Sequence, residues 1–462
     1  MHEQDRERIG TGDNNGKRDS MDTFRRSLLT IALPVTLQAL LQSSFSVIDQ
    51  IMIGQMGSDS IAGIGLGGKF ASIFTVVLNA VAAAAGIMVA QYIGQKNEKQ
   101  LARSFHVNMI FGILIAAVFM LGSILFPNEI MSLYTKDVAT GGLAADYLSI
   151  FCIAFIPMAV TTMTSVVLRC MEEAVAPLVV SFLSVIVNTC LNYLLIFGRF
   201  GCPAMGVQGA AAASVISQTG ACVLTLIFFF VKLRRRRIRM PFDIRLGRQD
   251  AGQYIGILAP ILICEFMWSL GENVYAGIYG NMGTGDCAAM TMTGPVQGLM
   301  IGALSGLAQA AGIMIGKSLG NEEYDIAYED SKRLIRCGII GSVLLSALLA
   351  VFGRYYVKIY NVDASVQMVS YHILLVFAII SPVKVQNMII GGGIIRSGGM
   401  TKYVMWIDII GTWIFGVPLG LLAAFVWRLP IPIVYFILSL EEVVRLLISI
   451  VIFRGRKWMR RL

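Results

Sequence analysis

Polar side chains stand inside several long apolar runs of this sequence, where lipid or other helices would surround them. In the first half, Asn188 and Asn192 are four residues apart and therefore share one face of a helix. Asp49 and Ser214 lie in two other apolar runs of the same half. One carboxylate with amide and hydroxyl oxygens suits a proton or a hard cation such as Na⁺. The alternative is that Asn188 and Asn192 only tie helices together, and the residues alone favour neither role.

The second half carries more charge in the same kind of surroundings. Glu265, Trp268 and Glu272 share one helical face, because the second and third lie three and seven residues after the first. Lys384 lies near the middle of its apolar run, where a charge costs roughly 2.5–3.5 kcal/mol on insertion scales. Glu265 lies at a similar depth, so we expect it to pair with Lys384, and Asp408 adds a carboxylate in the next run. Such a pair can be inert or act as a proton switch, and we favour the switch because both partners point toward an expected cavity.

The last apolar run contains three charges of its own. Glu441 and Glu442 precede Arg445 by four and three residues, so all three lie on adjoining positions of one helix. We therefore expect Arg445 to form a local, structural ion pair.

Patterns typical of enzymes are weak or missing in the sequence. Residues 283–286 match the GxGD pattern of intramembrane aspartyl proteases, but they fall in an expected turn. The sequence contains neither a GxxxxGK[ST] phosphate loop nor an HExxH motif. Its eight cysteines are scattered singly and its three histidines are far apart. We therefore expect that the protein is not an enzyme and binds no cofactor. The one metal ion that the sequence allows for is Na⁺, at Asp49, Asn188 and Asn192.

The composition predicts the elements that must position these side chains. The chain has 462 residues, of which 56% are hydrophobic and only 14% are charged, and its mean hydropathy is +0.72. A soluble domain carries about 25% charged residues, whereas a membrane-spanning helix needs about 20 mainly apolar ones. The sequence therefore predicts an all-α membrane protein with twelve transmembrane helices. The apolar runs are 28–53, 61–92, 102–126, 143–168, 175–197, 208–231, 252–280, 288–316, 334–353, 366–395, 403–427 and 431–452.

The basic residues predict how these helices are oriented. The net charge is +9, and most of the 37 Lys and Arg residues fall on the side of the membrane that carries both ends of the chain. Short cytoplasmic loops are rich in Lys and Arg. We therefore expect both termini in the cytoplasm. Our leading hypothesis separately places the chain in the plasma membrane of a prokaryote. Membrane lipids are expected partners, nucleic acid is not, and we expect a monomer.

The two halves of the sequence repeat each other. The block Ala-Ala-Gly-Ile-Met occupies residues 84–88 and again 310–314, and Arg169 and Arg396 each end a proline-containing run. Each half holds six runs, so we expect two six-helix lobes in the same orientation, related by a pseudo-two-fold axis along the membrane normal. Transporters built in this way bind their substrate between the halves. The expected parts are a tail (1–24), an N-lobe (25–231), a basic linker (232–250), a C-lobe (251–453) and a basic tail (454–462).

Short motifs spread over nearly the whole chain carry a family resemblance. They are residues 47–54, residues 192–211 with their glycines, residues 260–271, residues 396–399 and residues 455–458. Together they resemble the motifs of the MATE family, the multidrug and toxic compound extrusion antiporters. The resemblance implies a V-shaped, two-lobed exporter of twelve helices. Such an exporter exchanges bulky, amphipathic, often cationic compounds for H⁺ or Na⁺.

The resemblance also assigns roles to individual residues. It implies a cation-coupling site at Asp49, Asn188, Asn192 and Ser214. It implies a charged C-lobe cavity at Glu265, Glu272, Lys384 and Asp408, of which Glu265 matches a family acid. The chain departs from the family in two places, because some members have an acid where Asn192 and Lys384 stand. With Asp49 as the main acid of its lobe, the site suits a proton better than Na⁺, and we favour H⁺.

Two other functions compete with drug export. A lipid-linked precursor flippase of the same superfamily commonly has more spans and a strongly cationic cavity, whereas this chain carries several acids. An intramembrane protease needs two catalytic aspartates at one depth. Asp49 and Asp408 are the deep aspartates of this sequence, and neither lies in the protease motif.

Overall fold

The protein is all-α in every part that the structure describes. The computed structural model describes residues 22, 24–42, 52–53, 58–201, 203–244, 248–359 and 362–462, and these residues contain no strand. The first half comprises a helix at Phe24–Gln42 and then α2 (Ser58–Gly94), α3 (Glu98–Leu125), α4 (Pro127–Ser132), α5 (Val138–Phe151), η1 (Cys152–Ala154), α6 (Phe155–Cys170), α7 (Val175–Phe197), η2 (Arg199–Gly201) and α8 (Gly206–Arg236). The second half comprises α9 (Arg248–Met282), α10 (Thr284–Gly320), α11 (Tyr324–Val357), α12 (Ala364–Asn387), η3 (Met388–Ile395), α13 (Thr401–Ile409), η4 (Ile410–Gly416), α14 (Val417–Leu421), η5 (Leu422–Val426) and α15 (Ile431–Arg454).

In the part of the chain that the structure describes, twelve helical segments are long enough to cross a membrane, as the sequence predicts. Within the described residues, eleven of them are also apolar enough by composition alone. The twelfth, α15, has 24 residues but carries Glu441, Glu442 and Arg445 in its centre. Each of these three side chains is less than a tenth exposed. Because they are buried against other helices, α15 can cross the membrane without presenting its charges to lipid.

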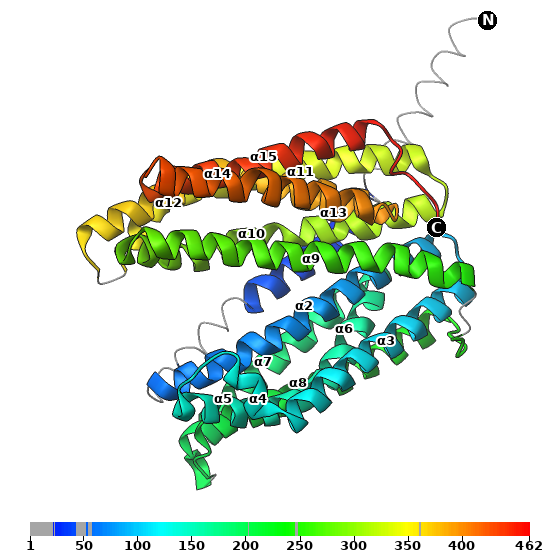
Figure 1. The fold of residues 1–462 in the computed structure, drawn as a ribbon. Coiled ribbons are helices and arrows are strands. Elements are labelled where there is room, and N and C mark those ends of the chain that lie inside the picture. The colour runs from blue at the N-terminus through cyan, green and yellow to red at the C-terminus, as the bar shows by residue number, and fades with distance from the viewer. Residues whose placement is uncertain are drawn as a thin grey trace, which may run out of the picture.

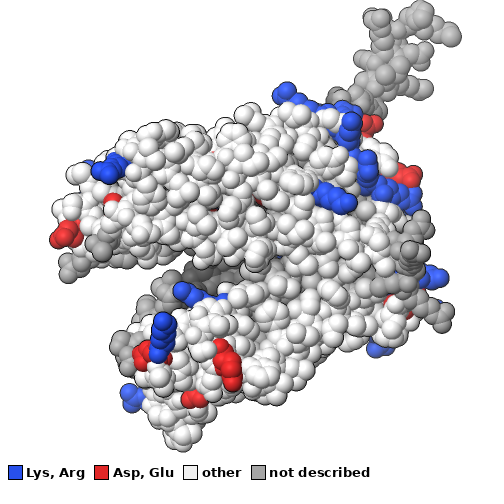
Figure 2. Space-filling view, in the orientation of Figure 1, with Lys and Arg blue, Asp and Glu red and all other residues white. Residues whose placement is uncertain are grey.

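The helices form two lobes that meet at one end and separate toward the other (Figure 1). The lobe of α2–α8 and the lobe of α9–α15 touch where α2 and α10 finish, and we call this the closed end. At the opposite, open end, a hollow separates the lobes (Figure 2). The prediction of a two-lobed, twelve-helix fold is therefore confirmed.

The closed end shows the repeat as a reciprocal contact. A Cβ atom on Gly94 would lie 2.1 Å from the carbonyl oxygen of Lys317, and one on Gly320 would lie 2.1 Å from that of Gln91. The sequence offset that relates residues 84–88 to 310–314 also relates Gly94 to Gly320 and Gln91 to Lys317. The two contacts are thus the same contact turned about a local two-fold axis. Any larger residue at either glycine would force the lobes apart.

The first helix of each lobe also packs against the other lobe. The helix at Phe24–Gln42 packs on α10, where the Thr36 hydroxyl donates to the carbonyl oxygen of Ala303 over 3.2 Å. In the same way, α9 packs against α2. The largest hydrophobic core therefore includes residues of both lobes, such as Val89 and Ile315, which are fully buried. The cleft is closed at this end by apolar packing.

Candidate functional site

The polar group of the N-lobe lies between α7 and α8. The Nδ2 atom of Asn192 donates to Oδ1 of Asn188 over 3.1 Å, and Nδ2 of Asn188 donates to the hydroxyls of Ser214 and Ser217 over 3.3 and 3.4 Å. Asn192 is 3% exposed. The two helices can approach closely because Gly209 has no side chain. A Cβ atom at this position would lie only 2.6 Å from the carbonyl oxygen of Leu195.

Three of the four residues predicted for the N-lobe site are therefore brought together. Asp49, the fourth, lies outside the residues that the structure describes. Asn188, Asn192 and Ser214 carry no charge and bond to one another, which is what a tie between helices requires. Whether the group also binds a cation stays a prediction that depends on Asp49.

The C-lobe holds a charged network in place of that neutral group. Arg396 lies with Nη1 at 3.6 Å from Oε1 of Glu265, and its Nη2 donates to Sγ of Cys264 over 3.3 Å. The Cys264 thiol in turn donates to Oδ2 of Asp408 over 2.8 Å. Glu265 and Cys264 lie on α9, Arg396 directly follows η3, and Asp408 lies on α13, so the network links three parts of the lobe.

Arg445 extends the network from Asp408 to α15. Its guanidinium lies 3.7 Å from Oδ1 of Asp408, 3.2 Å from Oε1 of Glu441 and 3.7 Å from Oε1 of Glu442. The Tyr275 hydroxyl donates to Oε2 of Glu441. The local ion pair predicted for Arg445 is confirmed, and it is one part of a larger arrangement.

The predicted pair of Glu265 with Lys384 is wrong. The Nζ atom of Lys384 lies 3.8 Å from Oε1 of Glu442, while Glu265 lies beside Arg396. Asn387, almost one turn after Lys384, donates to Oε2 of the same Glu442 over 2.8 Å. This part of α12 therefore faces α15, and the end of the same span brings Arg396 to α9.

The network contains one more acid than base. Its carboxylates are Glu265, Asp408, Glu441 and Glu442, and its cations are Lys384, Arg396 and Arg445. Glu272, the remaining residue predicted for this cavity, is exposed on α9 and forms no part of these pairs among the described residues. A network with a single surplus carboxylate can take up one proton and become neutral overall.

Sequence reasoning missed Cys264 and Arg396 as members of this site. The sequence indicates Arg396 only as the basic end of a span and as the repeat counterpart of Arg169. In the N-lobe, Nη2 of Arg169 donates to Oε1 of Gln38 over 3.0 Å, and Nε2 of Gln38 donates to Ser181 over 2.6 Å. Gln38, Arg169 and Ser181 precede Glu265, Arg396 and Asp408 by one constant offset. The repeat relates the two pairs to each other, but nothing in the sequence shows that Arg169 meets Gln38, so only the structure pairs Arg396 with Glu265.

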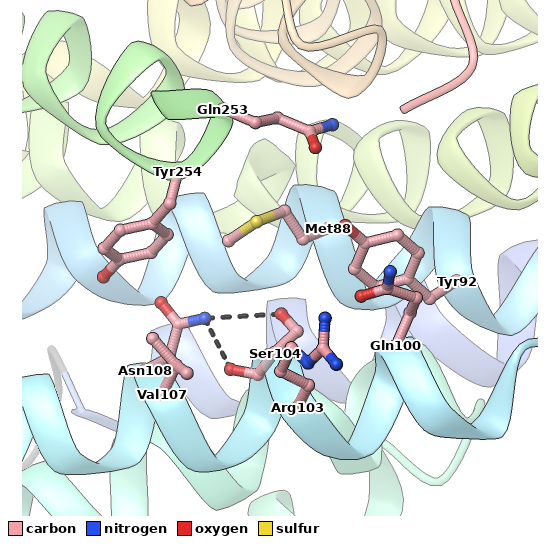
Figure 3. A pocket seen from close by; sticks show the side chains of 9 residues that line it. All are labelled: Met88, Tyr92, Gln100, Arg103, Ser104, Val107, Asn108, Gln253 and Tyr254. Carbon is pink, nitrogen blue, oxygen red and sulfur yellow. Dashed lines mark hydrogen bonds between the residues drawn. The ribbon is translucent and has the colours of Figure 1, made fainter. Parts of the chain in front are cut away.

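A small cavity lies in the seam between α2, α3 and α9 (Figure 3). Its volume is about 30 Å³, and it is lined by residues such as Met88, Asn108 and Tyr254. The Nδ2 atom of Asn108 donates to the carbonyl and hydroxyl oxygens of Ser104 over 2.7 and 3.4 Å. Its Oδ1 atom and the Tyr254 hydroxyl have no partner among the described residues. The cavity has room for water but not for an amphipathic compound.

Comparisons with known proteins agree with this architecture. The family model MatE matches residues 34–194 and 260–422. The probable multidrug resistance protein NorM of Thermotoga maritima is 24% identical, over 96% of this chain and 95% of its own. The multidrug resistance protein MdtK of Yersinia enterocolitica is also 24% identical, over 86% of this chain and 87% of its own.

Solved structures show the same fold at lower sequence identity. A mutant of the Vibrio cholerae MATE transporter VcmN matches with a TM-score of 0.86 at 16% identity, over 96% of this chain and 99% of that one. An outward-facing multidrug resistance MATE transporter of the MOP superfamily matches with a TM-score of 0.82 at 15% identity, over 93% and 95%. Because the family model covers most of the sequence and the curated relatives match nearly end to end, this chain belongs to the MatE family and is a MATE transporter rather than an enzyme.

Proposed function

We propose that this protein is a secondary active exporter of amphipathic, cationic compounds, driven by H⁺. The relatives that carry the names of multidrug resistance proteins support the class of substrate. The cleft between the lobes supports transport by alternating access, because repeats in the same orientation can rock about their common axis. The single observation that carries the choice of ion is the surplus carboxylate of the C-lobe network.

The network suits a proton better than Na⁺. A sodium ion needs several oxygen ligands that are free to coordinate it, whereas each of the four network carboxylates already lies beside an Arg or Lys side chain. A proton needs only one carboxylate, and its arrival removes the net charge of the network. Asp49 remains our candidate for a second proton-carrying acid in the N-lobe.

We further propose that the closed end faces the cytoplasm. Lys and Arg side chains gather at the closed end on the face shown in Figure 2, which is the pattern of a cytoplasmic surface. Both termini would then be cytoplasmic, in the plasma membrane of a prokaryote. The open cleft would face outward, the side on which an exporter releases its substrate.

Reconstitution in liposomes tests the proposed coupling. Liposomes with an imposed pH gradient and no Na⁺ should extrude a cationic dye against its gradient. A Na⁺ gradient at uniform pH should have no effect. Dye extrusion that requires Na⁺ and ignores the pH gradient would overturn the assignment of H⁺. Dye that moves only down its own concentration gradient, whatever ion gradient is imposed, would show passive passage and not active export.

A further inference from the structure

Residues 455–462, which we call the strap, lie in the seam between the lobes at the closed end. The strap follows α15 of the C-lobe, yet its last residues bond to α2 of the N-lobe. The backbone N–H of Leu462 donates to Oε1 of Gln91 over 2.8 Å, and Nε2 of Gln95 donates to the Leu462 carbonyl over 3.0 Å. Nε2 of Gln91 also donates to the Arg460 carbonyl over 3.1 Å. The strap therefore joins the two lobes.

The strap is firmly anchored on its own lobe. Trp458 is completely buried, its ring stacks on Phe453 with 5.7 Å between centroids, and its Nε1 donates to the Phe453 carbonyl over 3.0 Å. The Arg456 guanidinium lies 4.0 Å from the centre of the Tyr328 ring. A Cβ atom on Gly398 would lie 1.8 Å from the Trp458 carbonyl oxygen, so the backbones touch there. The strap is therefore expected to move together with the C-lobe.

Gln91 is the point at which the strap holds the N-lobe. Its side chain is completely buried, and its Nε2 also donates to the carbonyl of Ser397 over 2.7 Å. One N-lobe amide is thus held by two separate segments of the C-lobe. Its repeat counterpart, Lys317, makes the reciprocal contact as an ion pair at 2.6 Å to Glu172, and both of those side chains are a fifth or more exposed.

We propose that the strap is a conformational latch, which must release Gln91 and Gln95 before the lobes can separate at the closed end. Opening that end requires α2 to leave α10. The strap, which is anchored on the C-lobe, is bonded to α2 and so opposes this separation of the lobes. The Gln91 side chain is completely buried, so water cannot reach it to replace these bonds until separation has begun. The latch therefore sets how much of the protein is open at this end. This inference rests on the proposed function only in requiring that the lobes alternate between two openings.

Distances between the lobe tips at the open end test the latch. Spin labels introduced through unnatural amino acids at Val138 and Tyr355, which are 88% and 67% exposed, leave the native cysteines in place. The tips should approach when the closed end opens. The substitution Gln91→Leu keeps the bulk of the side chain and removes three hydrogen bonds. Losing one such bond shifts the equilibrium between the two conformations by roughly fivefold. The fraction of molecules with a short distance between the two labels should therefore rise at least tenfold. An unchanged distance distribution in the folded variant would overturn the latch.

A second variant and a matched control complete the experiment. Deletion of residues 459–462 removes the strap's hydrogen bonds to α2 without altering α2 itself. The fraction of molecules with a short distance should rise as in Gln91→Leu, and this variant serves as the test if Gln91→Leu does not fold. In the control, Gln208→Leu, the lost bond runs over 3.3 Å to Asp146 within the N-lobe, so the distances should not change. An equal rise in the control would show that the effect is not specific to the strap and would refute the proposal.

Dye export by the same variants separates this inference from the proposed function. Shifted distances in proteins that export no dye under any ion gradient would leave the latch standing and refute the exporter. Normal distances in the strap variants, together with H⁺-driven export, would refute the latch and leave the exporter standing.

Discussion

The two lobes place different chemistry on equivalent positions of one repeat. In the N-lobe, Arg169 is held by the neutral amide of Gln38, whereas in the C-lobe Arg396 lies beside the carboxylate of Glu265. The hydroxyl of Ser214 precedes the carboxylate of Glu441 by the same offset. The difference shows that the repeat fixes where a polar side chain stands, while the side chain itself decides whether the position can exchange a proton.

The largest expected effect on stability follows from removing Arg445, the cation that three C-lobe carboxylates share. Arg445→Met leaves Glu441, Glu442 and Asp408 without their common partner, and Arg445 is 7% exposed. Breaking a buried ion pair costs roughly 3–5 kcal/mol, so the variant should show a much lower melting temperature in detergent. The control is Gln218→Met at the equivalent N-lobe position, which should change the melting temperature far less. An equal decrease of the melting temperature in the two variants would contradict the proposed difference between the lobes.

The second prediction concerns the acid that the sequence places in the N-lobe. Asp49→Asn keeps the shape of the side chain but cannot exchange a proton, so we expect H⁺-driven dye export to be abolished while insertion into the membrane is normal. Export in liposomes and the amount of folded protein are the two measurements. Full export by a well-folded variant would leave the C-lobe network as the only coupling site of our proposal.

The third prediction sharpens the pairing within the C-lobe. A double-mutant cycle of Glu265→Gln with Arg396→Gln should give a coupling free energy of roughly 0.5–3 kcal/mol in thermal unfolding, because the two groups are in contact. A cycle of Glu265→Gln with Lys384→Met should be nearly additive, because Lys384 lies beside Glu442. The reverse result would restore the pair that the sequence suggested.

The smallest effect concerns the turn between α6 and α7 at the closed end. Burial raises the pKa of Glu173, but hydrogen bonds and charges from Lys232 and Arg236 outweigh it and hold that pKa below its ordinary value of 4.5. A carboxylate with a lowered pKa stabilises the fold above its unfolded-state pKa, and this stability is lost as the pH falls through the folded-state value.

The variant Glu173→Gln tests that acid dependence. Because the pair is partly exposed, we expect a cost of about 1 kcal/mol or less near neutral pH, shrinking as the pH falls below about 4.5. Melting temperatures of both proteins across this pH range provide the measurement. A difference that grows on acidification would contradict the lowered pKa.

The sequence located the membrane helices well because this property is local. In a bilayer the backbone must satisfy its own hydrogen bonds, so an apolar run of about 20 residues becomes a helix wherever it occurs. The run 175–197 has the bounds of α7 as observed. The run 334–353 is shorter than α11, because that helix begins at Tyr324 with polar turns such as the Asp330–Arg333 pair, which hydropathy does not register.

Only the tertiary structure decided which charges meet. The sequence determined that Glu265, Lys384 and Arg396 stand in apolar helices of one lobe, but not how those helices are rotated about their axes. A charge finds its partner through that rotation and through the reach of its side chain, and Arg396 reached Glu265 while Lys384 turned to Glu442. In the same way, the composition of residues 454–462 indicated a basic tail, and only the packing of the lobes showed that it binds Gln91 in the seam between them. Local backbone chemistry therefore determined the elements, and long-range packing determined the site.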